Sequence, residues 1–252
     1  GEFSMVAAFL MVVFAVDLQW PYWLSFLISL AGMALFGVIF NLGVYYPLRH
    51  RTFLPVIIAT IGASIFLANS VLAIYGPAPQ VLEGWFETPG IQLGPVYLDS
   101  QYLLIIAVTI ALVIFNYWFF EKTMLGKKLQ ATSQDKEMAS LLGISVSAMI
   151  MLTFIYSAVL GGLAGILVAP VLFVSIQMGA TIALKAFAAT IIGGFGDVTG
   201  AIIGGIALGI IETFGAAYVS VPYKDAFAFL VLIAFLVFRP QGIFGERVAE
   251  KA

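Results

Sequence analysis

The chain has 252 residues, a hydrophobic content of 62%, a mean hydropathy of +1.10 and a formal net charge of −2. Soluble domains contain about 45–50% apolar residues, so this composition excludes an ordinary soluble domain and supplies several of the roughly 20-residue apolar stretches that span a bilayer. Cysteine is absent and His50 is the single histidine, which excludes disulfides, thiolate metal sites, cysteine nucleophiles and a histidine metal cluster within these residues.

The first part of the chain alternates apolar runs with short polar breaks. Residues 3–16 form an apolar run of about half the membrane thickness, and Asp17 ends it. Residues 22–45 and 53–75 are uncharged and long enough to span, and the basic stretch 49–51 separates them. A loop at 76–100 with three acidic residues but no Lys or Arg then leads to a further predicted span at 101–119.

A polar island at 121–146 interrupts this pattern. It contains four Lys, two Glu and one Asp, in a chain in which only 10% of residues are charged. Such a segment cannot lie in hydrocarbon, so we expect a loop at the membrane surface. Ser133 is predicted to cap a short helix within it, with Asp135 and Glu137 in the first turn and Gly143 at the C-terminal end.

The predicted helix at 133–143 has one apolar face. Met138, Leu141 and Leu142 lie three and four residues apart and therefore share that face. Periodicity alone leaves three alternatives open, namely a solvated surface helix, a helix lying on the bilayer, and a helix that docks onto a partner protein.

The second part of the chain opens with an uncharged run at 144–184, which is too long for one ordinary spanning helix. Pro170 and Gly179 are the predicted breaks, which gives a helix at about 147–169, an irregular turn and a second segment at about 180–193. A flexible turn around Asp197 is predicted next, followed by helices at 198–219 and 223–238. The turn contains Gly193, Gly194, Gly196 and Gly200.

The distribution of basic residues orients these spans. Nine of the eleven Lys and Arg lie at 49–51, 122–136 or 239–251, and the predicted spans place these three regions on one side. By the positive-inside rule that side is cytoplasmic, and the loop 76–100 lies opposite.

Several residues in apolar sequence have both a functional and a structural interpretation. Lys185, Glu212, Asp197 and Gln177 could line a solute path, or they could snorkel, pair with neighbours and cap a helix. The same choice between path lining and interhelical hydrogen bonding holds for Asn41, Asn69 and Asn116. The small-residue spacings, which permit either a moving interface or static packing, are Gly161/Gly165, Gly200/Gly204 and Gly205/Gly209.

Four stretches together resemble the permeases of ABC transporters, and most of all the branched-chain amino acid family of the LivH type. The sequence QDKEMASLLGI at 134–144 is similar to the cytoplasmic coupling loop, and KAFAATIIGGFGDVTGAIIGG at 185–205 to a second signature. The family is also similar to the ending, which is Tyr223-Lys224-Asp225 followed by an apolar helix and Arg239-Pro240-Gln241-Gly242-Ile243-Phe244-Gly245. The opening Gly1-Glu2-Phe3 resembles the family as well. In the family the opening step follows a further hydrophobic segment, which we expect this chain to lack.

The resemblance implies an all-α, polytopic transmembrane helical bundle that forms one permease domain over 1–252, with 121–146 as its cytoplasmic coupling loop. Within that loop it implies ATPase coupling by Ser133, Asp135, Glu137, Met138, Ala139, Leu141, Leu142 and Gly143. The implied assembly has a second related permease, two cytoplasmic ATPases and an extracytoplasmic solute-binding protein, in the bacterial inner membrane. The implied solutes are leucine, isoleucine and valine, or a small polar relative such as urea or an amide.

Nucleotide chemistry is expected on other subunits. Gly126-Lys127 lacks both the glycine five residues earlier and the following Ser or Thr of a P-loop, so ATP and Mg²⁺ are expected on the partner ATPases and no cofactor in this chain. An ion-coupled secondary transporter that uses Glu212 or Asp197 is the main alternative. A membrane enzyme is the other, and neither metal-ligand spacing nor a Ser/His pair supports it.

Overall fold

The structure is a computed structural model that describes residues 1–49, 51–85, 90–93, 96–194, 196–239 and 241–244. His50, Pro240 and Gly245, which the sequence analysis named, lie outside the described residues. Contacts between Cα atoms divide the chain into two compact units, Gly1–Ala180 and Thr181–Ala252, and each is described by itself.

The first unit contains most of the helices and a small hairpin. Its elements in chain order are α1 (Glu2–Val12), the π-helical turn η1 (Val13–Asp17), α2 (Tyr22–Phe40), the π-helical turn η2 (Asn41–Tyr45), the 3-10 turn η3 (Tyr46–Leu48), α3 (Phe53–Tyr75), β1 (Ile91–Leu93), β2 (Val96–Leu98), α4 (Ser100–Lys122), α5 (Met124–Gln134), α6 (Lys136–Leu141) and α7 (Val146–Leu172). The strands β1 and β2 pair antiparallel within the segment expected to be only a loop.

The second unit is a helical hairpin with one additional helix. It holds most of α8 (Gln177–Gly193), which begins in the first unit, together with α9 (Val198–Tyr218), the 3-10 turn η4 (Val221–Tyr223) and α10 (Lys224–Phe238). The strands β1 and β2 have three residues each, and the other elements of the described residues are helices or helical turns. The predicted all-α fold is therefore confirmed.

Five helical segments are long and apolar enough to cross a membrane. Within the described part of the chain these are Tyr22–Leu48, Leu54–Tyr75, Ser100–Lys122, Val146–Leu172 and Val198–Tyr218. The predicted spans are therefore confirmed at these places, and α8 is a shorter apolar helix of 17 residues.

The predicted breaks after residue 144 were partly wrong. Pro170 lies inside α7, which continues to Leu172, and Gly179 lies inside α8 rather than between two helices. Helix α7 continues for two residues beyond Pro170, because a proline ring disfavours further helix but does not forbid a last turn. Gly179 is instead a packing position, since a Cβ there would lie 3.1 Å from the Gly1 carbonyl oxygen.

Helix α1 forms the centre of the first unit by packing against α7 and α2. Its buried face includes Met5, Ala7, Ala8 and Met11, each with no exposed surface. The Ser4 hydroxyl donates a 2.7 Å hydrogen bond to the Gly161 carbonyl, and the Ser4 backbone occupies the place of a Cβ at Gly165. The small-residue spacing Gly161/Gly165 therefore permits close packing of α7 on α1, as its sequence indicated.

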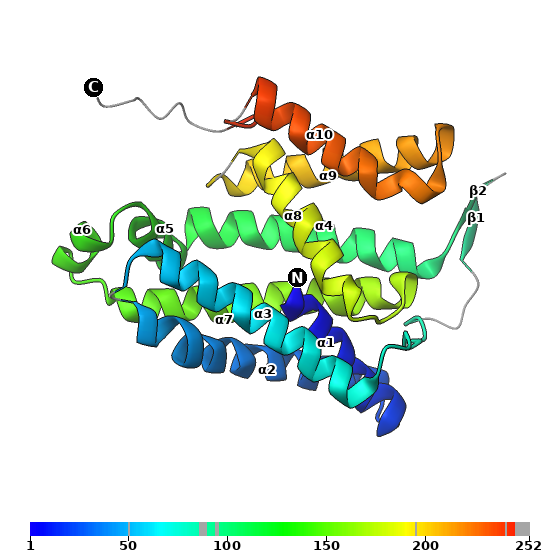
Figure 1. Cartoon of the computed structure of the whole chain (residues 1–252), viewed down its shortest axis with the longest axis horizontal. Helices are drawn as coiled ribbons and strands as arrows, with labels where there is room; N and C mark the ends of the chain where they lie inside the picture. The colour runs from blue at the N-terminus through cyan, green and yellow to red at the C-terminus, as the bar shows by residue number, and fades with distance from the viewer. Residues whose placement is uncertain (50, 86–89, 94–95, 195, 240, 245–252) are drawn as a thin grey trace. The chain divides into compact units, whose positions relative to one another are not determined.

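The polar and hairpin segments lie at opposite ends of α4. Figure 1 shows α5 and α6 beyond the C-terminal end of α4, with β1 and β2 beyond its N-terminal end. The Asp99 side chain caps α4 by accepting a 2.8 Å hydrogen bond from the Gln101 backbone N–H. The two loop regions of opposite charge character are thus separated by the length of a spanning helix.

The core of the second unit lies between α8, α9 and α10. Ala188, Ala189, Ile192, Leu208 and Ala228 form its buried apolar cluster. On α9 a Cβ at Gly204 would collide with the Ala189 carbonyl of α8, whereas a Cβ at Gly209 would meet nothing within 4 Å in the described residues. Close packing is thus confirmed at Gly200/Gly204, and Gly209 has no such neighbour.

Candidate coupling segment and charged cluster

The polar island forms two helices instead of the single helix predicted at 133–143. Helix α5 ends at Gln134 and α6 begins at Lys136, with extended backbone at Asp135 between them. Ser133 is therefore not the N-cap. It lies in the last turn of α5, where its hydroxyl donates a 2.8 Å hydrogen bond to the Gln130 carbonyl.

Asp135 caps α6 in place of Ser133. Its carboxylate accepts hydrogen bonds from the backbone N–H groups of Glu137 at 2.8 Å and Met138 at 3.0 Å. A carboxylate satisfies two of the unpaired N–H groups at once and complements the positive end of the helix dipole, which a hydroxyl does less well. Glu137 adds a second negative charge to the first turn, as predicted.

Gly143 ends α6 as predicted. Its φ of +78° is a left-handed conformation that residues with a Cβ disfavour. The Gly143 N–H bonds to the Ser140 carbonyl at 3.0 Å, and the Ile144 N–H bonds to the Ala139 carbonyl at 3.0 Å. These two bonds form a Schellman motif, so both ends of the six-residue helix are fixed.

The two faces of α6 differ sharply in exposure. Met138, Leu141 and Leu142 are 55%, 81% and 71% exposed, whereas Ala139 between them is 1% exposed. This apolar face is open to contact with a partner protein or with the bilayer surface, and its exposure equals that of residues on the predicted spans such as Phe66 at 71%. Met124 and Leu125 at the start of α5 are also exposed, and the sequence analysis did not predict them as part of an apolar surface.

Helix α5 is joined closely to the end of α4. The Thr123 hydroxyl accepts a 3.0 Å hydrogen bond from the Gly126 N–H and donates one of 2.6 Å to the Phe119 carbonyl. A Cβ at Gly126 would collide with the backbone of Phe119 and Phe120. The hydrogen bonds and the close backbone contact at this corner therefore restrict movement of α5 relative to α4.

A charged cluster lies between the helices of the second unit. Lys185 on α8 forms ion pairs of 3.0 Å with Glu212 on α9 and 2.8 Å with Asp225 on α10. The Glu212 side chain is 8% exposed. Pairing offsets the large cost of placing a charge in an apolar environment. The structural interpretation of Glu212, pairing with a neighbour, is confirmed, and a role in a solute path stays a prediction.

Sequence reasoning did not identify Asp225 as the second partner of Lys185. Asp225 lies 40 positions after Lys185, at the start of α10. A carboxylate in the first turn of an apolar helix indicates a residue that needs a charged or polar partner. The identity of that partner depends on the packing of α8, α9 and α10, which brings the three charges together.

The described residues of the glycine turn after α8 form a closely packed, capped corner. The Asp197 carboxylate caps α9 by accepting a 2.6 Å hydrogen bond from the Gly200 N–H, so its predicted capping role is confirmed. Gly194 and Gly196 have positive φ values, and a Cβ at Gly193 would collide with Gly200. Replacing these glycines would strain the corner.

The two signature stretches of this unit meet at that corner. The Ile243 N–H donates to the Ile192 carbonyl and the Phe244 N–H to the Gly193 carbonyl, each at 2.9 Å. The segment after α10 therefore returns to the end of α8 and closes the unit.

The amide side chains named from the sequence behave differently from one another. Asn116 on α4 accepts a hydrogen bond from the Tyr156 hydroxyl on α7, which confirms an interhelical role. Asn69 donates a 2.7 Å hydrogen bond to the carbonyl of Ile65 in its own helix. Asn41 is buried beside a pocket described below, and Gln177 is the first residue of α8. A path role for Gln177 stays a prediction.

Comparison with known proteins places this arrangement in a family. The model of a family described as "Branched-chain amino acid transport system / permease component" matches residues 1–236. The chain belongs to this permease family. The family's permeases are membrane proteins, and together with the five apolar helices this membership makes the chain a multi-pass membrane protein.

Individual relatives agree with the family match. This permease is 34% identical over 232 residues to the high-affinity branched-chain amino acid transport system permease protein BraD of Pseudomonas aeruginosa, covering 90% of this chain and 76% of the relative. It is 31% identical over 256 residues to LivH of Salmonella typhimurium, covering 99% and 82%. It is 29% identical over 198 residues to the autoinducer 2 import system permease protein LsrC of Escherichia coli, covering 73% and 55%. No solved structure matches the chain significantly.

Proposed function

We propose that this chain is the permease subunit of an ATP-driven importer in the bacterial inner membrane, with leucine, isoleucine and valine as its solutes. The family description and the names of BraD and LivH support this solute class. A small polar relative such as urea or an amide is the second solute class. Residues 1–252 act as one permease domain, with 121–146 as its cytoplasmic coupling loop.

The observation that carries the coupling proposal is α6, a short helix fixed at both ends that exposes three large apolar side chains. Met138, Leu141 and Leu142 dock into a groove on a cytoplasmic ATPase subunit, which binds the ATP and Mg²⁺ that this chain does not. The Asp135 cap and the Gly143 motif keep α6 formed, so that it moves as a rigid body.

Motion of α6 reaches the membrane through α5. The Thr123 corner and the close contact at Gly126 tie α5 to α4, so a displacement of the coupling segment tilts α4. The solute then passes between this subunit and a second related permease, after delivery by an extracytoplasmic solute-binding protein. Lys185 and Glu212 are the proposed path residues, with Gln177 and Asp197 as further candidates.

Reconstitution tests the proposal. Purification from cells that express the neighbouring transporter subunits should yield a complex containing an ATPase pair, and proteoliposomes of that complex should take up labelled leucine only with ATP on the ATPase side. Uptake that follows an ion gradient in vesicles without ATPase subunits would instead establish the secondary-transporter alternative.

Cysteine labelling tests the topology. The chain has no cysteine, so single replacements are unambiguous. Val81→Cys in the loop 76–100 should react with a membrane-impermeant maleimide from outside, and Leu141→Cys only after the membrane is opened. Both side chains are exposed within this chain. Labelling is therefore done on the permease expressed without its ATPase subunits, where failure to label would not come from burial. Labelling of Val81→Cys from the cytoplasmic side alone would contradict the proposed orientation.

A further inference from the structure

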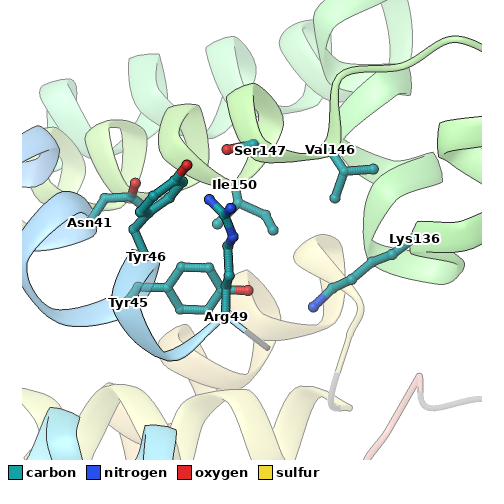
Figure 2. A pocket seen from close by; sticks show the side chains of 8 residues that line it. All are labelled: Asn41, Tyr45, Tyr46, Arg49, Lys136, Val146, Ser147 and Ile150. Atoms are coloured by element: carbon teal, nitrogen blue, oxygen red, sulfur yellow. The ribbon is translucent and has the colours of Figure 1, made fainter. Parts of the chain in front are cut away.

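A pocket lies where α2 ends, at the junction with α6 and α7. It has a volume of about 190 Å³ and is lined by Asn41, Tyr45, Tyr46, Arg49, Lys136, Val146, Ser147 and Ile150. This volume exceeds several-fold the roughly 30 Å³ that a water molecule takes in the liquid, so the pocket has room for a small polar group. Figure 2 shows Lys136 extending toward the space from the side opposite Tyr45, Tyr46 and Arg49.

The polar groups of this pocket are mostly hydrogen-bond donors. Two of the eight described lining residues, Arg49 and Lys136, carry positive charge, and none of the eight carries a carboxylate. Two acids adjoin Lys136 in sequence and neither lines the pocket: Asp135 uses its carboxylate to cap α6, and Glu137 follows in the first turn of that helix. Tyr45 and Ser147 add hydroxyl groups. This composition favours an anion over a cation or a neutral ligand.

Asn41 supplies an independent reason to expect a ligand. Its side chain is 3% exposed, and its amide nitrogen has no hydrogen-bond partner among the described residues. A buried N–H₂ group without a partner costs stability, and native proteins rarely leave one unpaired without a functional reason. Asn41 and Tyr45 also begin and end the π-helical turn η2, and such turns occur often at functional sites.

Arg49 is held in an orientation suited to oxyanions. Its guanidinium carbon lies 3.7 Å from the centroid of the Tyr46 ring. Stacking on an aromatic face restricts the orientation of a guanidinium group, whose planar set of N–H donors suits phosphate and carboxylate oxygens. The Lys136 ammonium and the Asn41 amide line the same pocket. Together with Arg49 they supply the kinds of donor that a ligand with several acceptor oxygens requires.

We propose that this pocket binds a phosphate group, through Arg49 and Lys136 with Asn41 as an additional donor. Two sources can supply that group, the headgroup of an anionic phospholipid and free inorganic phosphate. The lipid source rests on the proposed orientation, in which the basic stretch 49–51 and the loop 121–146 are cytoplasmic. In that orientation the pocket lies at the level of the lipid headgroups, where basic pockets between spanning helices bind anionic lipids. A phosphate held by both cations joins α6 directly to the end of η3, where Arg49 lies.

Native mass spectrometry of the purified full chain in detergent tests the proposal. The probes are phosphatidylglycerol, phosphatidylcholine and inorganic phosphate. Wild-type protein should retain phosphatidylglycerol in preference to phosphatidylcholine. Arg49→Gln and Lys136→Gln should each weaken retention roughly 10- to 100-fold, since hydrogen bonds to charged groups are worth about 1.5–3 kcal/mol. Lys128→Gln removes the same charge from an exposed position of α5 outside the pocket and should leave retention unchanged.

Competition between phosphatidylglycerol and inorganic phosphate identifies the source of the bound phosphate group. Retained phosphatidylglycerol that inorganic phosphate does not displace assigns the lipid, and saturable phosphate binding without lipid retention assigns the free ion. Asn41→Asp keeps the side-chain shape and adds a negative charge, so it should abolish binding of either probe. If Asn41→Asp does not fold, the Lys136 variant still decides, because its side chain is exposed on α6. Retention of both probes by the Arg49 and Lys136 variants at the level of the Lys128 variant would overturn the proposal. None of these readouts depends on transport, so they stand apart from the test of the proposed function.

Discussion

Leu141→Asp is the substitution that tests the coupling proposal most directly. Leu141 is 81% exposed within this chain, so it contributes little to folding and is available almost entirely to a partner. The membrane part should therefore fold and purify as wild type. Docking onto the ATPase subunit should fail, because the new carboxylate would have to leave water to enter an apolar groove.

The expected loss can be worked from the exposed area. Full burial of a leucine side chain is worth about 1.5–3 kcal/mol, and about four-fifths of that, about 1.2–2.4 kcal/mol, is available at Leu141. At about 1.4 kcal/mol per tenfold change, the ATPase should bind roughly 10- to 50-fold more weakly. Burial of the aspartate carboxylate adds to this loss, so the estimate is a lower bound.

Two measurements on the purified complex check this expectation. The ATPase subunits should dissociate from the permease at lower detergent or subunit concentration, and solute-stimulated ATP hydrolysis should fall. Val81→Asp is the matched control, because it places the same charge at an exposed apolar position of the loop 76–100, outside α5 and α6. Wild-type assembly and wild-type stimulated hydrolysis in Leu141→Asp would show that α6 is not the coupling element.

Three further predictions concern the backbone and the charges that hold the fold. Gly143→Val should weaken coupling by about 1–2 kcal/mol of lost α6 stability, whereas Gly143→Asn should cost less since asparagine tolerates positive φ, and ATPase co-elution compares the two. Gly204→Ala should lower thermal stability by about 1–3 kcal/mol because its Cβ collides with α8, whereas Gly209→Ala on the same helix should be neutral or slightly stabilising. Equal melting temperatures for these two variants would contradict the packing. Lys185→Met should destabilise by about 3–5 kcal/mol because it leaves Glu212 buried without a cation, and Glu212→Gln should cost less in the same thermal assay.

Local signals in the sequence predicted the elements well. Apolar runs longer than a bilayer's requirement become helices almost regardless of context, because backbone groups in hydrocarbon must bond within their own segment. Gly143 and Asp197 were also predictable, since positive φ and N-capping are decided within a few residues. The error at Ser133 has the same local origin, because Asp135 competes for the same capping position and its carboxylate is the stronger acceptor.

Contacts between distant segments needed the tertiary structure. The Lys185–Glu212–Asp225 cluster joins three helices, and no spacing rule connects their positions. The sequence predicted a helix break at Gly179, whereas the fold uses it for close packing against the backbone of Gly1. The role of a glycine depends on the backbone that packs against it. The pocket of Arg49, Lys136 and Asn41 likewise exists only once α2 and α7 are packed and α6 is turned back by its caps. Apolar runs of membrane length and capping signals of a few residues thus determined where the helices are. Side-chain packing across long sequence separations decided which charged and polar groups face one another.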